Sequence, residues 1–216
     1  DSLTTDPWAS AHLILMNPPF ISRDYLAPEE IASVNAVLGD DLAKGRVDMA
    51  MAFIWKAVQS VLPGGVVATV LPTGLLESQG GRAWRDAIAQ VCDVLLVGRF
   101  EGYKYFTTSI IETVFAVFRK RVATNAQAPR PDVSLLISQE GKEDAAVRFL
   151  RLRQQGIDRQ VDGVDLYVAS PKWALGASWT PLREGNYRLH EWTQASDVQK
   201  IGNLFSVTLG VRFRYK

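Results

Sequence analysis

The sequence predicts an α/β protein, with a mostly parallel sheet and flanking helices followed by a smaller α/β segment. Short apolar runs alternate with helical patterns in the first half of the chain, as β-α-β units do. The 216 residues are 47% hydrophobic and 22% charged, which is typical of a globular protein and excludes wholesale disorder. A small, polar, proline-containing stretch at 123–131 has no periodicity. We therefore expect one domain over residues 1–122 and a second segment over residues 123–216.

The first elements of the chain follow from apolar runs and turn formers. Residues 12–16 (HLILM) predict a strand that ends at the following prolines, because proline neither donates to a ladder nor continues a helix. A short helix is expected after Pro28. Asp48 can cap a longer helix that runs to about Leu62, with apolar residues at the helical period, before a Pro-Gly-Gly sequence ends it.

The remaining elements repeat these patterns. Residues 66–71 form a continuous, mostly β-branched run, as expected for a strand covered on both faces. A helix over about 81–91 and strands at 93–97 and 113–118 complete the first part. The second part predicts a strand at 133–138, a helix over about 143–154, a strand at 164–169, a short helix at 197–204 and a strand-like end at 204–216.

Composition excludes several classes of protein. A single cysteine, Cys92, cannot form an internal disulfide, so a reducing compartment such as the cytoplasm is favoured. Two histidines, His12 and His190, lie far apart in the sequence and no cysteine cluster accompanies them, so we expect no zinc site and no other metal. The apolar runs are too short to span a bilayer, so we expect no membrane partner. The net charge of +1 alone leaves binding to phosphate undecided.

The strongest signal is the tetrad Asn17-Pro18-Pro19-Phe20, directly after the first predicted strand. The carboxyl ends of parallel strands form the ligand crevice of a doubly wound sheet, so the tetrad is expected at a site. It resembles the catalytic signature of S-adenosylmethionine-dependent amino-group methyltransferases, above all adenine-N6 DNA methyltransferases. The resemblance implies a partial Rossmann-like methyltransferase sheet.

That resemblance also implies a role for each residue of the tetrad. The Asn17 side-chain oxygen and the Pro18 carbonyl accept hydrogen bonds from the adenine amine, which holds its nitrogen in line with the methyl group. Phe20 stacks on an adenine rotated out of the duplex, and Pro19 lines the base site. Phe106, seven residues before the 113–118 strand, matches the second aromatic at the base; a core aromatic is the alternative.

The resemblance covers about residues 12–121 and is to the class that places target recognition last. Residues 200–216 resemble the entry to a target recognition domain, although Phe213 and Arg214 stand where that class usually has Thr-Gly. Arg212, Arg214 and Lys216 would share one strand face and contact DNA phosphate, or they are charges of a solvated edge strand.

The cofactor implied is S-adenosylmethionine, but its main binding loop is missing, because no Gly-x-Gly occurs in the sequence. We expect a catalytic-half fragment of a restriction–modification or phage-defence methyltransferase that is inactive alone. Double-stranded DNA is the expected partner, with a fused or separate restriction and specificity module. The alternatives are methyl transfer to protein glutamine or an RNA amine, and a non-catalytic DNA-binding module.

Overall fold

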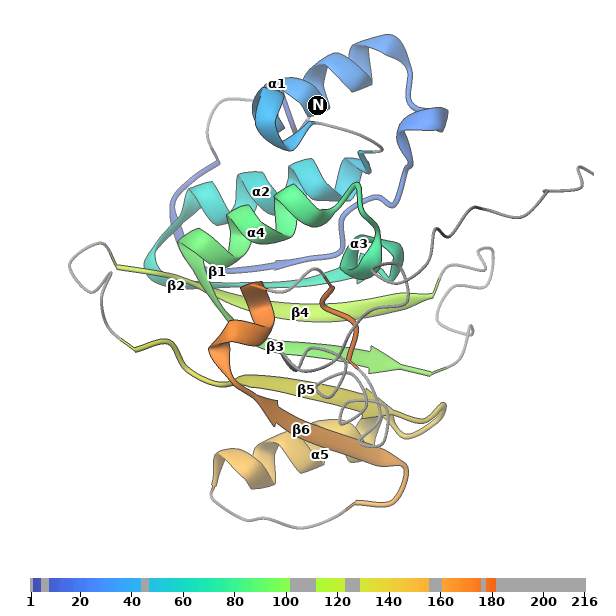
Figure 1. The fold of residues 1–216 in the computed structure, drawn as a ribbon, viewed down its shortest axis with the longest axis vertical. Helices are drawn as coiled ribbons and strands as arrows, with labels where there is room; N and C mark the ends of the chain where they lie inside the picture. The colour runs from blue at the N-terminus through green and yellow to red at the C-terminus, as the bar shows by residue number, and fades with distance from the viewer. Residues whose placement is uncertain are drawn as a thin grey trace, which may run out of the picture. The chain divides into compact units, whose positions relative to one another are not determined.

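A mixed sheet forms the centre of the part of the chain that the computed structural model describes (Figure 1), namely residues 2–4, 8–43, 47–101, 112–122, 129–155, 161–175 and 178–181. The sheet has six strands in the order β1-β2-β4-β3-β5-β6. Their bounds are β1 (Ala11–Met16), β2 (Val61–Pro72), β3 (Cys92–Phe100), β4 (Thr113–Lys120), β5 (Val133–Ser138) and β6 (Val164–Ala169).

The strand directions confirm the predicted α/β class. β1 pairs with β2 and β3 pairs with β5 in parallel, whereas β4 is antiparallel to both of its neighbours and β6 is antiparallel to β5. As a result β1, β2, β3 and β5 run in one direction, and β4 and β6 run in the other. The carboxyl ends of β1, β2, β3 and β5 lie at the same end of the sheet, which we call the carboxyl edge.

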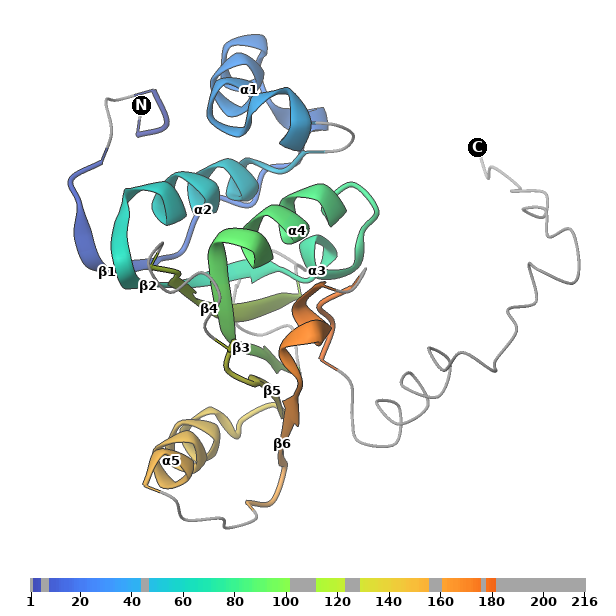
Figure 2. The same cartoon turned by 60° about the vertical axis from the view of Figure 1, so that its left-hand side comes forward.

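Helices lie on both faces of the sheet. Their bounds are α1 (Pro28–Leu42), α2 (Met49–Ser60), α3 (Gly74–Glu77), α4 (Arg82–Val91) and α5 (Glu143–Gln154), with two 3-10 turns, η1 (Arg23–Tyr25) and η3 (Pro171–Leu175). α2 and α4 lie side by side on one face, and on the other face α5 packs mainly on β5 and β6 (Figure 2). Residues 66–71 of β2 alternate between half-buried and buried, so the prediction that the 66–71 strand is covered on both faces is wrong. None of the described helices is long and apolar enough to cross a membrane.

The main core lies between the sheet and the α2–α4 layer. Trp84 of α4 and Phe118 of β4 both pack on Trp179, with ring centroids 6.2 and 5.8 Å from it. The indole N–H groups are satisfied, since Trp84 donates to the Met51 carbonyl at 3.1 Å and Trp179 donates to the Ala174 carbonyl at 2.7 Å. Trp84 belongs to the helix predicted over about 81–91, whereas Trp179 belongs to no element that the sequence predicts.

β2 is longer than predicted and begins at Val61, directly after α2 ends. Val61 pairs with Ala11, and the next pair joins Val66 to Leu13, so β2 carries extra residues opposite β1 in this bulge. Gly65 fits there because a Cβ atom would lie 2.6 Å from the Val61 side chain and 2.9 Å from the His12 carbonyl oxygen. The Pro-Gly-Gly sequence therefore forms a bulge inside the strand instead of ending the helix.

The strands on either side of the predicted boundary at 123–131 belong to the same sheet. β5 pairs in parallel with β3, and residues 1–181 group into one compact unit. The division into residues 1–122 and 123–216 stays a prediction. The helix predicted at 197–204 and the strand-like end at 204–216 lie outside the described residues.

Candidate active site

The tetrad lies where the sequence placed it, at the carboxyl edge directly after β1. Met16 is the last residue of β1 and pairs with Thr69 of β2. Asn17 and Pro19 are exposed, Pro18 is buried and Phe20 is half-buried. The tetrad thus combines a buried proline anchor with an accessible amide side chain.

The far side of this loop is fixed to the start of α2. The Met49 N–H donates to the Ile21 carbonyl at 2.9 Å, and the Arg23 N–H donates to the Val47 carbonyl at 3.0 Å. Between these two hydrogen bonds, Ser22 and Asp48 form an antiparallel bridge. The loop is therefore held by β1 at one end and by α2 at the other, which limits the conformations it can adopt.

Asp48 supports this second attachment. Its side chain accepts a hydrogen bond from the Ala50 N–H at 2.8 Å, so it caps α2 as predicted. Burial raises the pKa of Asp48 from 3.8 to about 6, although the hydrogen bond from Ala50 opposes the shift. The sequence indicated the cap but not its place beside the tetrad, because the bridge joins residues 26 positions apart.

An open apolar cavity of about 430 Å³ begins beside Asn17. Three neighbouring strands line it: Leu15, Met16 and Asn17 at β1, Ala68, Thr69 and Val70 of β2, and Phe115, Ala116 and Val117 of β4. Apart from Asn17 and Thr69, the lining residues are apolar. The tetrad is therefore not lost in packing, because Asn17 is exposed and lines open space.

Phe115 forms part of the cavity wall because Gly98 leaves room for its ring. The two residues are directly paired between β4 and β3, and a Cβ atom on Gly98 would lie 2.0 Å from the Phe115 ring. Phe115 also packs on Phe100, with ring centroids 5.0 Å apart. The glycine thus sets the position of one wall of the cavity.

The other predicted site residues lie outside the described residues, namely Phe106, Arg212, Arg214 and Lys216. The ends of the segment that carries Phe106 are described, and both lie at the carboxyl edge. On one side, the Glu101 N–H donates to the Ser138 carbonyl at 2.8 Å. On the other, the Glu112 carbonyl accepts from both the N–H and the hydroxyl of Thr73 at 3.0 Å, and its carboxylate pairs with Arg99.

Known proteins share both the fold and stretches of the sequence. The type II methyltransferase M.BanIII of Aneurinibacillus aneurinilyticus is 23% identical over 103 residues, which are 48% of this chain and 17% of that protein. The type IIG restriction endonuclease BpuSI has a TM-score of 0.65 and 18% identity over 89% of this chain and 23% of its own. The methyltransferase subunit of a type I restriction–modification system from Streptococcus thermophilus has a TM-score of 0.53 and 17% identity, covering 80% of this chain and 38% of its own.

This chain spans less than a quarter of the length of M.BanIII and of BpuSI. The family model described as N-6 DNA Methylase matches residues 1–200, which confirms the resemblance suggested by the tetrad. Because the match extends over nearly all of the sequence, the chain belongs to the N-6 DNA methylase family.

Proposed function

We propose that this chain supplies the catalytic loop of an S-adenosylmethionine-dependent methyltransferase that modifies the N6 amine of adenine in DNA, within a restriction–modification system. The observation that carries the proposal is the exposed Asn17 beside an open cavity, held on a loop that is anchored at both ends. Membership of the N-6 DNA methylase family supports the same reaction.

The loop chemistry suits an aromatic amine, which is a weak nucleophile because its lone pair is delocalised into the ring. The Asn17 side-chain oxygen and the Pro18 carbonyl oxygen would accept hydrogen bonds from the two N–H bonds of the amine. These hydrogen bonds would stabilise the positive charge that develops on its nitrogen. Proline adds no competing N–H donor. Because the loop is already held by β1 and α2, little conformational freedom would be lost when the amine binds.

S-adenosylmethionine fits the chemistry of the residues at the carboxyl edge. S-adenosylmethionine would supply an activated methyl group on sulfur, and the chain offers two oxygen acceptors next to an apolar wall. Asn17 and Pro18 would orient the amine toward that methyl group. The main cofactor-binding loop is not among the residues that we assign, in agreement with the lack of a Gly-x-Gly sequence.

Two aromatic residues would hold the adenine base. Phe20 follows the prolines and is half-buried, and Pro19 next to it is exposed. We assign Phe106 to the same base site because both ends of its segment are anchored at the carboxyl edge, near the tetrad. Stacking of this kind is worth about 1–3 kcal/mol per base.

Double-stranded DNA is the proposed substrate, and residues 123–216 would lead into a target recognition region. There Arg212, Arg214 and Lys216 would contact backbone phosphates, which fix position rather than sequence. A fused or separate restriction or specificity module is the proposed partner.

The test uses the protein that carries this chain and S-adenosylmethionine labelled in its methyl group. Duplex DNA, a glutamine peptide and RNA are offered in parallel. Label is expected in adenine of DNA, and Asn17→Ala should lower kcat about 10²–10³-fold with nearly unchanged DNA affinity, since it removes one transition-state acceptor. Gln90→Ala, an exposed change at the end of α4, serves as the control. Label in peptide or RNA alone would refute the assignment, as would full activity of Asn17→Ala.

A further inference from the structure

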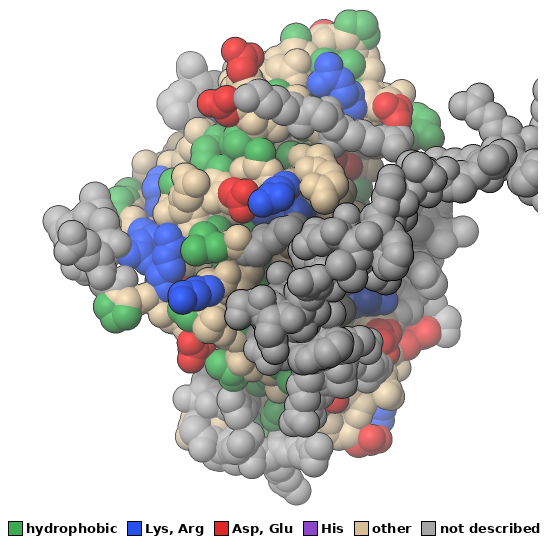
Figure 3. Space-filling view, in the orientation of Figure 1, with side chains coloured by type: hydrophobic (Ala, Val, Ile, Leu, Met, Phe, Trp, Pro, Cys, Tyr) green, Lys and Arg blue, Asp and Glu red, His purple; other side chains and the backbone are tan. Residues whose placement is uncertain are grey.

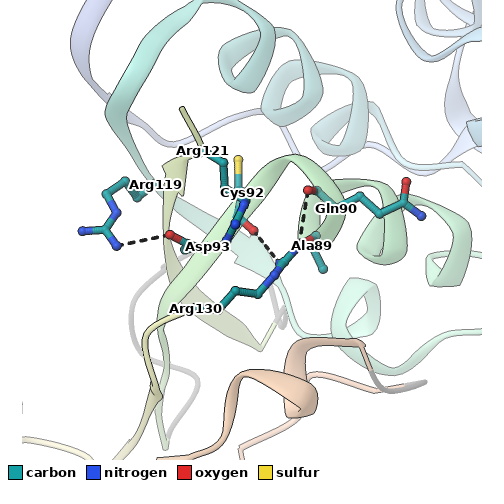
Figure 4. Close-up of polar contacts among 7 residues, drawn as sticks. All are labelled: Ala89, Gln90, Cys92, Asp93, Arg119, Arg121 and Arg130. Atoms are coloured by element: carbon teal, nitrogen blue, oxygen red, sulfur yellow. Dashed lines mark hydrogen bonds and ion pairs between the residues drawn. The ribbon is translucent and has the colours of Figure 1, made fainter. Parts of the chain in front are cut away.

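A cluster of charged side chains, four positive and one negative, lies at the end of the sheet opposite the carboxyl edge. β3 begins there and β4 ends there. We call Asp93, Arg119, Lys120, Arg121 and Arg130 the basic cluster, and Figure 4 shows all of them except Lys120. Lys and Arg side chains gather on this side of the molecule, at the left of Figure 3. The proposed methyl transfer does not use any of these residues.

One carboxylate orients two guanidinium groups in the cluster. Asp93 accepts from Arg119 through Oδ2 at 3.1 Å and from Arg121 through Oδ1 at 2.8 Å. The Asp93 side chain is only 10% exposed, and the Arg121 side chain is only 12% exposed. Asp93 therefore holds both cations in place, but its single negative charge cannot neutralise two.

The other two cations contact neutral carbonyl groups. Lys120 Nζ donates to the Gln59 and Val61 carbonyls at 2.7 and 2.9 Å, at the end of α2. Arg130 donates to the Ala89, Gln90 and Cys92 carbonyls at the end of α4. These contacts satisfy helix ends. They leave the formal charge in place, so the cluster has four positive groups and one negative group.

A pocket of about 290 Å³ opens over this cluster. The described residues that line it are Gly64, Asp93, Arg119, Lys120, Arg121, Val122 and Pro129. Three cations and one carboxylate thus face the same small space. The Arg119 side chain is 44% exposed and uses one nitrogen for Asp93, so it can reach an incoming ligand.

We propose that this pocket binds a phosphate group, with Arg119 as the principal donor and Asp93 as the group that positions it. A guanidinium matches the geometry of phosphate oxygens with two parallel N–H donors. The excess positive charge of the lining favours an anion, and the pocket is several times larger than one phosphate. The proposal does not depend on the methyl transfer.

The phosphate can belong to a small molecule or to the DNA backbone. Strand spacing and rise place Arg119 roughly 15 Å from Asn17, two strands across and about four residues along the sheet. A backbone phosphate here would therefore be a contact separate from the base site. If the phosphate belongs to DNA, a change at Arg119 should weaken the binding of DNA. If it belongs to a small molecule, the binding of DNA should not change.

The experiment titrates this chain with inorganic pyrophosphate by calorimetry, at an ionic strength held constant with chloride. Saturable binding is expected, and Arg119→Gln should weaken it at least fivefold, with its folding checked by circular dichroism. Arg82→Gln is the matched control, because Arg82 is 59% exposed and its ion pair among the described residues is with Asp86, at 3.9 Å on its own helix. A parallel titration with a 12-base-pair duplex identifies the source of the phosphate.

Weaker duplex binding by Arg119→Gln but not by Arg82→Gln assigns the pocket to backbone phosphate. Loss confined to pyrophosphate assigns it to a small molecule. The proposal is overturned if pyrophosphate and duplex both fail to bind saturably, or if Arg119→Gln and Arg82→Gln bind both ligands alike.

Discussion

Asp48 offers the sharpest test of the link between α2 and the loop that carries the tetrad. The change Asp48→Asn keeps a side-chain oxygen for the Ala50 N–H and removes the charge. Asparagine caps helices about as well as aspartate. The variant therefore isolates the cost of holding a carboxylate at this half-buried position.

The size of that cost follows from the pKa. Burial raises the pKa of Asp48 from 3.8 to about 6, which corresponds to an upper limit of about 3 kcal/mol at 1.36 kcal/mol per unit. Solvent screening of the partly exposed side chain reduces this figure. Loss of the favourable interaction between the charge and the helix N-terminus reduces it further. We expect Asp48→Asn to stabilise the protein by about 1 kcal/mol at pH 8.

The pH dependence has a definite sign. Because the folded pKa lies above the unfolded value, the folded state binds more protons between pH 4 and 6, and stability falls as pH rises through this window. The Tm of Asp48→Asn should exceed that of the unchanged protein by about 2–4 °C at pH 8, and the difference should vanish below about pH 4.

Thermal unfolding followed by circular dichroism from pH 4 to 8 measures both quantities. Asp40→Asn, on the exposed side of α1, is the control and should leave the Tm unchanged. A difference independent of pH would refute the reasoning. So would a lower Tm for Asp48→Asn at pH 8, since the carboxylate would then stabilise the loop attachment.

Three further predictions concern the packing around the site. Gly98→Ala should cost about 1–3 kcal/mol in urea denaturation, because its Cβ would meet the Phe115 ring at 2.0 Å; adding Phe115→Leu should recover part of the loss. Trp179→Ala should cost about 3–5 kcal/mol, because it empties a fully buried position and removes the bond to Ala174. Burial raises the pKa of Cys92 to about 12, so the native thiol should resist alkylation at pH 8 and react only after unfolding.

Local signals in the sequence were sufficient to locate the tetrad and most elements. The prolines after Met16 end β1, and Asp48 begins α2, because each acts on its own neighbours in the chain. The apolar period of residues such as Met51 and Ile54 predicts the buried face of α2. These features need no knowledge of what packs against them.

Long-range pairing decided the features that the sequence did not predict. β2 begins at Val61 because Ala11 pairs with it, and the extra residues that follow are absorbed by a bulge. β5 joins β3 across a stretch that resembles a linker. Trp179 enters the core through contacts with residues more than 60 positions away. Amino-acid composition and hydrophobic periodicity do not indicate which distant residues pair with one another.

The site divides its tasks between buried and exposed residues, and this division separates function from stability. Pro18 and Met49 are both buried, so changes at either would disturb the fold as well as the chemistry. Asn17 is exposed, and its loss should change the free energy of unfolding by less than about 0.5 kcal/mol. An Asn17→Ala variant that folds normally but does not methylate would therefore assign the lost activity to the amide itself, because the scaffold that presents it remains intact.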